Sequence, residues 1–157
     1  MSPALQGRFV ACDRIIAQCD IDYQLLVTAD INEDFFADYH NIRIVNSFLF
    51  NFSKLQDKIG ARLLKNVLYE LKEIDNFSVP MLDVLHLLER LEIIDTATIW
   101  DELRETRNMI AHDYPLEISA RIATIHLIRD RYPTLKTIYH RLRSRVMCQA
   151  GSVDEAL

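Results

Sequence analysis

One stretch of the chain says more about the fold and the function than any other. It reads Leu103-Arg104-Glu105-Thr106-Arg107-Asn108-Met109-Ile110-Ala111-His112-Asp113-Tyr114-Pro115. Apolar or small side chains recur through it and just before it at helical spacing, at Ile99, Leu103, Thr106 and Ile110. This spacing predicts an amphipathic helix with one buried face. Thr98 is followed three residues later by Asp101, which predicts that the helix begins there with a capping box.

The position of Arg107 on this helix is unusual for a charged residue. At 3.6 residues per turn, Trp100, Arg104 and Arg107 share a strip that adjoins the apolar face. A guanidinium there is costly to bury unless an anion, a carboxylate or water meets it. If the role of Arg107 is structural, it would pair with Glu102 or Asp113.

The helix is expected to stop close to His112. Pro115 disfavours the helical conformation for Tyr114, so the last helical residue should fall between Ala111 and Asp113. In a continuous helix His112 would lie roughly 140° around the axis from Arg107. A helix that ends at the histidine can turn the imidazole and the Tyr114 phenol back toward the arginine. The patch would then combine a fixed cation, a group that titrates near neutral pH and a phenol, which suits a scissile phosphate.

The order of these residues, Arg107, four residues, His112, one residue and Tyr114, resembles the motif of HEPN-domain toxins of the HepT type. The surroundings are similar as well: Trp100 opens the motif helix, Asn108 follows the arginine, and the segment 82–89 precedes an Ile93-Ile94-Asp95 turn. The likeness is strongest from about Ser78 to Pro115. It implies an all-α fold, an antiparallel up-and-down bundle of four to five helices that forms a homodimer.

The resemblance also implies an activity and a partner. Such a toxin is a metal-independent endoribonuclease whose two motifs face each other across the dimer, and its antitoxin is a minimal nucleotidyltransferase (MNT) that transfers AMP to the motif tyrosine, here Tyr114. Arg107 and His112 would be the catalytic residues. From its chemistry, His112 can accept or donate a proton near pH 7 and Arg107 can hold phosphate oxygens. Asn108 could orient His112 or hold a phosphate oxygen, and Arg104 could extend the cationic surface.

Two other classes of function remain open from the sequence. Without the resemblance, an arginine and a histidine near a helix end are commonly structural, with the histidine capping the helix C-terminus. The chain could also be a non-catalytic HEPN subunit that serves a nucleotidyltransferase by binding its substrate, or a helical interaction module. No motif identifies which RNA would be cut.

Composition supports a single helical domain. The chain has 157 residues, half of them hydrophobic, with three glycines and four prolines, which favours a helical bundle over a β-rich fold. We expect one domain over residues 1–149 and a flexible tail over 150–157. No apolar run reaches the length of a membrane span and the start lacks a signal peptide, so we expect a cytoplasmic protein with Cys12 and Cys19 as reduced core thiols. We expect no cofactor and no metal site.

The remaining helices are predicted from periodicity and helix-end signals. A first helix should run from about Gly7 to Thr28, and Asn32 should cap a longer second helix that bends at Gly60. This second helix holds more aromatic residues than one packed stripe needs, either as a dimer interface or as additional core: Phe35, Phe36, Phe48, Phe50 and Phe52. Another helix should start near Ser78 and Pro80, and a last one should follow Pro115 and be kinked or broken at Pro133.

Charge is distributed unevenly. The net charge of −5 argues against a general nucleic-acid coat protein. The segment from Arg121 to Arg145 nevertheless contains seven basic residues and only one acid, Asp130. This segment could give RNA an electrostatic path to the site. Alternatively, it is a solvated helix face or a surface that docks an acidic partner.

Overall fold

The computed structural model describes residues 1–154, with side chains through Ser152, and the helices it contains confirm the all-α prediction. No strand occurs in this part of the chain. The helices are α1 (Pro3–Thr28), η1 (Asp34–Ala37), α2 (Tyr39–Lys58), η2 (Ile59–Leu63), α3 (Leu64–Glu70), α4 (Met81–Arg90), α5 (Ala97–His112) and α6 (Ile118–Asp154). Because η2 joins α2 to α3 without a break, the chain forms five helical rods.

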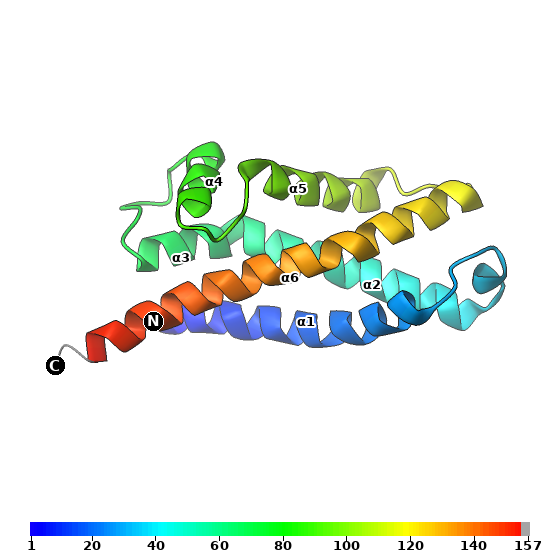
Figure 1. Cartoon of the computed structure of the whole chain (residues 1–157), viewed down its shortest axis with the longest axis horizontal. Helices are drawn as coiled ribbons and strands as arrows, with labels where there is room; N and C mark the ends of the chain where they lie inside the picture. Colours follow the sequence, from blue (N-terminus) through cyan, green and yellow to red (C-terminus); the bar gives the residue numbers. More distant parts are fainter. Residues whose placement is uncertain (155–157) are drawn as a thin grey trace.

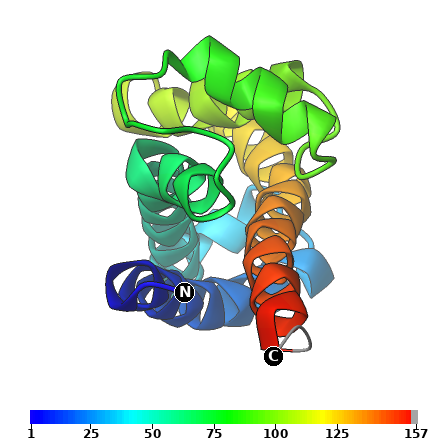
Figure 2. The same cartoon turned by 90° about the vertical axis from the view of Figure 1, so that its left-hand side faces the viewer.

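The rods pack around one hydrophobic core. In Figure 1, α1 lies beside α2, and the long helix α6 lies along both of them. The end view in Figure 2 shows α1 below, α2 and α3 on one side, α6 on the other, and α4 and α5 above. Helix α5 contacts α2, α4 and α6. The motif helix is therefore held from three sides, and only its outer face is left to solvent.

Most of the aromatic residues of the second helical region belong to this core. Phe35, Phe48 and Phe52 are buried and Phe36 packs partly against them, whereas Phe50 is 64% exposed. Four of the five phenylalanines therefore belong to the core, as the second of the two alternatives predicted. Only Phe50 is placed where it could serve an interface.

The N-terminal helix starts earlier than periodicity indicated. The Ser2 hydroxyl accepts a hydrogen bond from the Leu5 amide at 3.2 Å, and Pro3 occupies the first turn, where its missing N–H costs nothing. Asn32 does not cap α2; its side-chain oxygen accepts a hydrogen bond from the Phe35 amide of the short η1 at 3.0 Å. Asp38 caps α2 itself by accepting from the His40 amide. The expected second helix is thus two elements.

Gly60 does mark an irregularity, and the structure gives its cause. The chain passes from α2 to α3 through a π-helical turn at Ile59–Leu63. A Cβ at Gly60 would lie 2.8 Å from Cζ2 of Trp100, which is fully buried on α5. Glycine thus lets the indole of the motif helix pack directly on the backbone of this turn. π-turns of this kind occur frequently at functional sites.

The start of α5 differs from the prediction. The N-cap is Thr96, whose hydroxyl accepts from the Ile99 amide at 3.3 Å, and Thr98 is already inside the helix. The Glu89 carboxylate of α4 accepts from the Ala97 amide at 2.9 Å. A residue of the preceding helix therefore supplies the second cap, which a capping-box search within the α5 segment does not find.

The last helix is longer than expected and is not broken. Helix α6 continues through Pro133 for 37 residues, from Ile118 to Asp154. It includes residues 150–154, where we expected the flexible tail to begin. The rest of that tail, residues 155–157, lies outside the described residues.

Polar contacts join α6 to α1 along their length. Asp20 accepts from the Tyr132 hydroxyl at 2.6 Å and from the Lys136 ammonium at 2.9 Å. About two helical turns further along, Asp13 accepts from the Tyr139 hydroxyl and from Arg143. Cys12 and Cys19, on the same helix α1, are buried free thiols as predicted, and burial raises the pKa of Cys12 to about 11.

No helix in residues 1–154 combines the length and the apolar character that crossing a membrane requires.

Candidate functional site

Arg107 has a partner that the motif stretch does not contain. Its Nε lies 2.7 Å from Oδ1 of Asp57 and its terminal amino group 2.9 Å from Oδ2, a two-pronged ion pair between α5 and the end of α2. Neither Glu102 nor Asp113 takes this role, so both expected partners were wrong. The Arg107 side chain is 28% exposed and that of Asp57 48%. The guanidinium sits at the rim of the core with its outer edge open.

This pairing affects how the arginine can act. The hydrogen bonds that Arg107 donates to Asp57 raise the pKa of the guanidinium above its ordinary value, so its charge is permanent. The two oxygens of Asp57 occupy the fork that would otherwise hold two phosphate oxygens. A phosphate at Arg107 must therefore displace Asp57 or bind along the guanidinium edge that Asp57 leaves free.

His112 is the last residue of α5, as Pro115 predicted, and its side chain is exposed. The Asp113 amide closes the helix by donating to the Met109 carbonyl at 3.0 Å. Because His112 is still helical, it lies about 140° around α5 from Arg107 and about 7.5 Å further along the axis. The helix end does not turn the imidazole back toward the arginine, and no hydrogen bond within the described residues joins the two.

Tyr114 has left the helix, as expected, but it faces another arginine. Its ring is half-buried against the core, and the Arg121 guanidinium of α6 lies 5.7 Å from the ring centroid. Arg121 in turn donates to the carbonyls of Pro115 and Leu116. Burial raises the pKa of the Tyr114 phenol, an effect that the charge of Arg121 partly opposes. The phenol is therefore protonated at neutral pH.

The two supporting residues lie on the outer face of α5. Arg104 makes an exposed ion pair with Asp101 at 3.0 Å, a contact that contributes little to stability. Asn108 is exposed one residue beyond Arg107. Counting around the helix, Arg104, Asn108 and His112 share one exposed face, with Arg107 at its edge. The candidate site is thus an open strip and not a closed pocket.

Asp57 is the site residue that sequence reasoning missed. It lies 50 positions from Arg107 in the chain, at the exposed end of α2. Helical periodicity places Asp57 on the line of α2 that also holds Tyr39 and Phe50, both exposed. A carboxylate at the end of this exposed face of α2 is the sequence feature that could have suggested a partner for Arg107. Only the packing of α5 on α2 shows that it meets Arg107.

The basic segment of α6 is engaged within the molecule. Every one of its seven basic side chains has a carboxylate, hydroxyl or carbonyl partner: Arg121 with Pro115 and Leu116, Arg129 with Asp130, Arg131 with Glu102 and Thr106, Lys136 with Asp20, Arg141 with Asp95, Arg143 with Asp13, and Arg145 with Leu91. Four of these partners are carboxylates that cancel the charge. This segment therefore has less unpaired positive charge to offer RNA than its sequence indicates.

Residues 1–152 contain no group of three or more histidine, cysteine, aspartate or glutamate side chains placed to hold a metal ion.

Comparison with known proteins adds no relative. No protein-family model matches the chain, and neither the curated proteins nor the solved structures give a match. The resemblance to HEPN toxins therefore rests on the motif residues and their helical setting.

Proposed function

We propose that this chain is a HEPN-type ribonuclease, the toxin of a HEPN/MNT pair, with its cleavage site at the outer face and end of α5. The observation that carries the proposal is the placement of Arg107. A permanently charged guanidinium is held in a fixed orientation at the rim of the core, beside the exposed Asn108 and on the helix that ends at His112. A phosphodiester fits a forked cation next to a group that exchanges protons near pH 7.

The proposed reaction uses the 2′-hydroxyl of RNA as the nucleophile. The imidazole of His112 takes the proton of the 2′-hydroxyl as the bond between O2′ and phosphorus forms. Arg107 stabilises the negative charge that grows on the phosphoryl oxygens. The bond from phosphorus to O5′ then breaks, and O5′ takes a proton from an imidazolium. The products are a 2′,3′-cyclic phosphate and a 5′-hydroxyl.

One chain does not supply all these groups in one place, which supports a homodimer. Arg107 and His112 face different sides of α5, and each chain has a single motif histidine. A two-fold pairing of an up-and-down bundle would bring the arginine and histidine of one copy opposite those of the other. The exposed Phe50, two turns before Asp57 on the same line of α2, gives such an interface an apolar part.

Tyr114 fits the proposed control by AMP transfer from an MNT partner. The phenol lies two residues beyond His112 and outside the helix, so an attached nucleotide would place its phosphate near the motif. Arg121, already against the Tyr114 ring, offers that phosphate a cation. Since the phenol is protonated at neutral pH, the transferase has to supply the base that removes its proton.

The test is cleavage of a mixed-sequence, fluorescently labelled RNA by the purified chain in excess EDTA. Arg107→Ala should lower the cleavage rate on the order of a hundredfold or more through lost charge stabilisation. Arg129→Ala, which removes an arginine paired on α6, is the matched control and should leave the rate unchanged. Product ends are read by mass spectrometry. Full activity of Arg107→Ala, or 3′-hydroxyl products, would contradict the proposal.

The Arg107–Asp57 pair also favours a second candidate, a non-catalytic binding or interaction module. A two-pronged ion pair between two helices is what a purely structural arginine forms. In that case Arg107→Ala and Asp57→Ala should lower the melting temperature equally and the wild-type chain should cut no RNA. If the arginine serves phosphate, Asp57→Asn should retain cleavage, because its competing negative charge is gone.

A further inference from the structure

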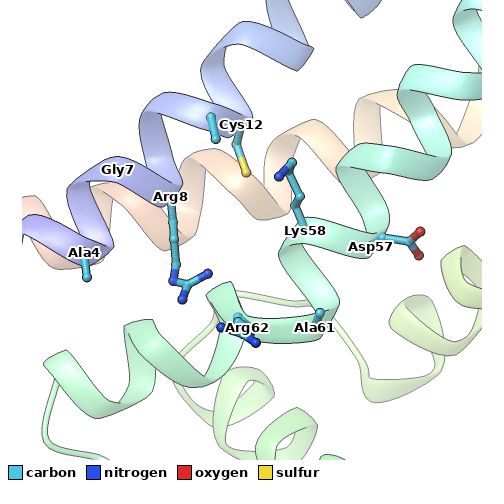
Figure 3. Close-up of a pocket in the computed structure, with 9 residues that line it drawn as sticks. Ala4, Gly7, Arg8, Cys12, Asp57, Lys58, Ala61 and Arg62 are labelled. Atoms are coloured by element: carbon cyan, nitrogen blue, oxygen red, sulfur yellow. The ribbon is translucent and has the colours of Figure 1, made fainter.

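A groove beside the candidate site contains cations that nothing in the described chain neutralises. It is a cavity of about 490 Å³ between α1 and the π-turn, with a floor of small residues (Ala4, Gly7, Ala11 and Ala61). Arg8, Lys58 and Arg62 line it, and none of the three makes an ion pair with the described residues. Figure 3 shows Arg8 extending from α1 toward the turn that carries Arg62.

The arrangement of these side chains favours a bound anion. Cations from α1 and from the π-turn line one open space, where an anion would reduce their mutual repulsion. The Nε of Arg8 is fully buried and has no hydrogen-bond partner within the described residues. Asp57 lines the same cavity, but its carboxylate turns away toward α5, where it binds Arg107. The nearest carboxylate is therefore occupied elsewhere.

The groove continues away from the site toward an exposed aromatic ring. A second hollow of about 350 Å³ shares Arg8, Ala61 and Arg62 with the first and adds Lys65 and Phe77. Phe77 is 48% exposed, and its inner face stacks on Tyr69 with the ring centroids 5.1 Å apart. A line of cations that ends at a supported, exposed aromatic ring matches the way proteins hold single-stranded nucleic acid, by phosphates and by stacked bases.

We propose that this groove, lined by Arg8, Lys58, Arg62 and Lys65 and ending at Phe77, binds the backbone of single-stranded RNA next to the cleaved phosphate. The inference rests on the proposed ribonuclease function for the identity of the ligand. Asp57 links the two places, because it lines the groove and also binds Arg107. The strand would run from the outer face of α5 past Asp57 into the groove. Its phosphates would give Arg8 and Arg62 the negatively charged partners that the described chain does not provide.

The experiment measures binding of a fluorescein-labelled, fully 2′-O-methylated 12-nucleotide oligouridylate by anisotropy at several salt concentrations. This probe cannot be cut through its 2′-oxygen. Arg62→Ala should weaken binding about tenfold and reduce the salt dependence by about one phosphate contact. Phe77→Ala should weaken binding about fivefold with the salt dependence unchanged. Arg14→Ala, an exposed arginine of α1 outside the groove, is the matched control and should bind as the wild type does.

The outcomes separate this inference from the ribonuclease proposal. Cleavage of unmodified RNA is measured independently, so binding that depends on Arg62 supports the groove even if no cleavage occurs. Arg8→Ala tests a second position of the groove. Because part of Arg8 is buried, circular dichroism checks that this variant is folded. If it is not, Arg62, which is exposed, is sufficient for the test. Equal binding by Arg62→Ala and Arg14→Ala would overturn the inference. So would a wild-type chain that does not bind the probe.

Discussion

The two basic regions of this molecule look alike in composition and differ in what their charges do. On α6, basic residues are concentrated in the sequence, but Lys136 and Arg143 bind Asp20 and Asp13 of α1. Between α1 and the π-turn, Arg8 and Arg62 are 54 positions apart and meet only in the fold. The first region joins two helices. The second leaves positive charge facing an open groove, so the density of charge along the sequence does not show where charge is available.

The largest expected effect on stability comes from removing a carboxylate of α1 that binds α6. Asp20→Ala takes away the acceptor of the Tyr132 hydroxyl, which is buried, and the partner of Lys136. Leaving a buried donor unpaired should lower the free energy of unfolding by about 2 kcal/mol. Urea denaturation followed by circular dichroism measures this. Adding Tyr132→Phe to Asp20→Ala removes the orphaned hydroxyl and should recover part of the loss; a double variant less stable than the single one would refute this account of α6.

A smaller effect is expected at the turn that shapes the groove. Gly60→Ala would place a methyl group 2.8 Å from the Trp100 ring, and overpacking of this kind costs roughly 1–3 kcal/mol. Alanine gains up to about 1 kcal/mol over glycine in a helix. The net loss of unfolding free energy should be about 1 kcal/mol. Gly7→Ala on α1 is the control, since nothing lies within 4 Å of its added methyl group, and it should be neutral or stabilising.

The sequence predicts some of these structural features and not others. Periodicity and helix-end signals predict the all-α fold, the buried face of α5, the stop at His112 and an irregularity at Gly60. They do not predict Thr96 as the cap, the continuity of α6 through Pro133 or the Asp57 partner of Arg107. The Thr96 cap is a local contact that a second candidate, Thr98, concealed in the sequence. The Asp57 contact joins residues 50 positions apart, and local spacing carries no information about such a contact.

The candidate site is less predictable than the fold for a related reason. The motif names Arg107, His112 and Tyr114, but their directions are set by neighbours outside it: Asp57 of α2 fixes the arginine, and Arg121 of α6 covers the tyrosine ring. A patch in which all three converge was therefore wrong for a single chain. Lys58, Arg62 and Lys65 lie close together in the sequence, but only the packing of α1 on the π-turn brings Arg8 to the same groove.

The smallest expected effect concerns a lysine of the groove. Lys58→Ala removes one of the groove cations, which has no ion-pair partner in the described chain, so the free energy of unfolding should change by less than about 0.5 kcal/mol. At low salt the variant should be slightly more stable than the wild type, since like charges no longer repel. Lys136→Ala, which loses the Asp20 contact, is the matched lysine on α6 and should be destabilised. Equal losses in the two variants would remove the distinction between the regions.

The most direct test of the central claim, that the end of α5 cuts RNA, is the cleavage rate of one labelled RNA by the wild type, His112→Ala and His86→Ala. His86 is an exposed histidine of α4, away from the motif, so its variant controls for the loss of a surface imidazole. We predict that His112→Ala lowers the rate about a hundredfold or more at an unchanged melting temperature, while His86→Ala cuts as the wild type does. Equal rates for all three proteins, or no cleavage by the wild type, would contradict the account.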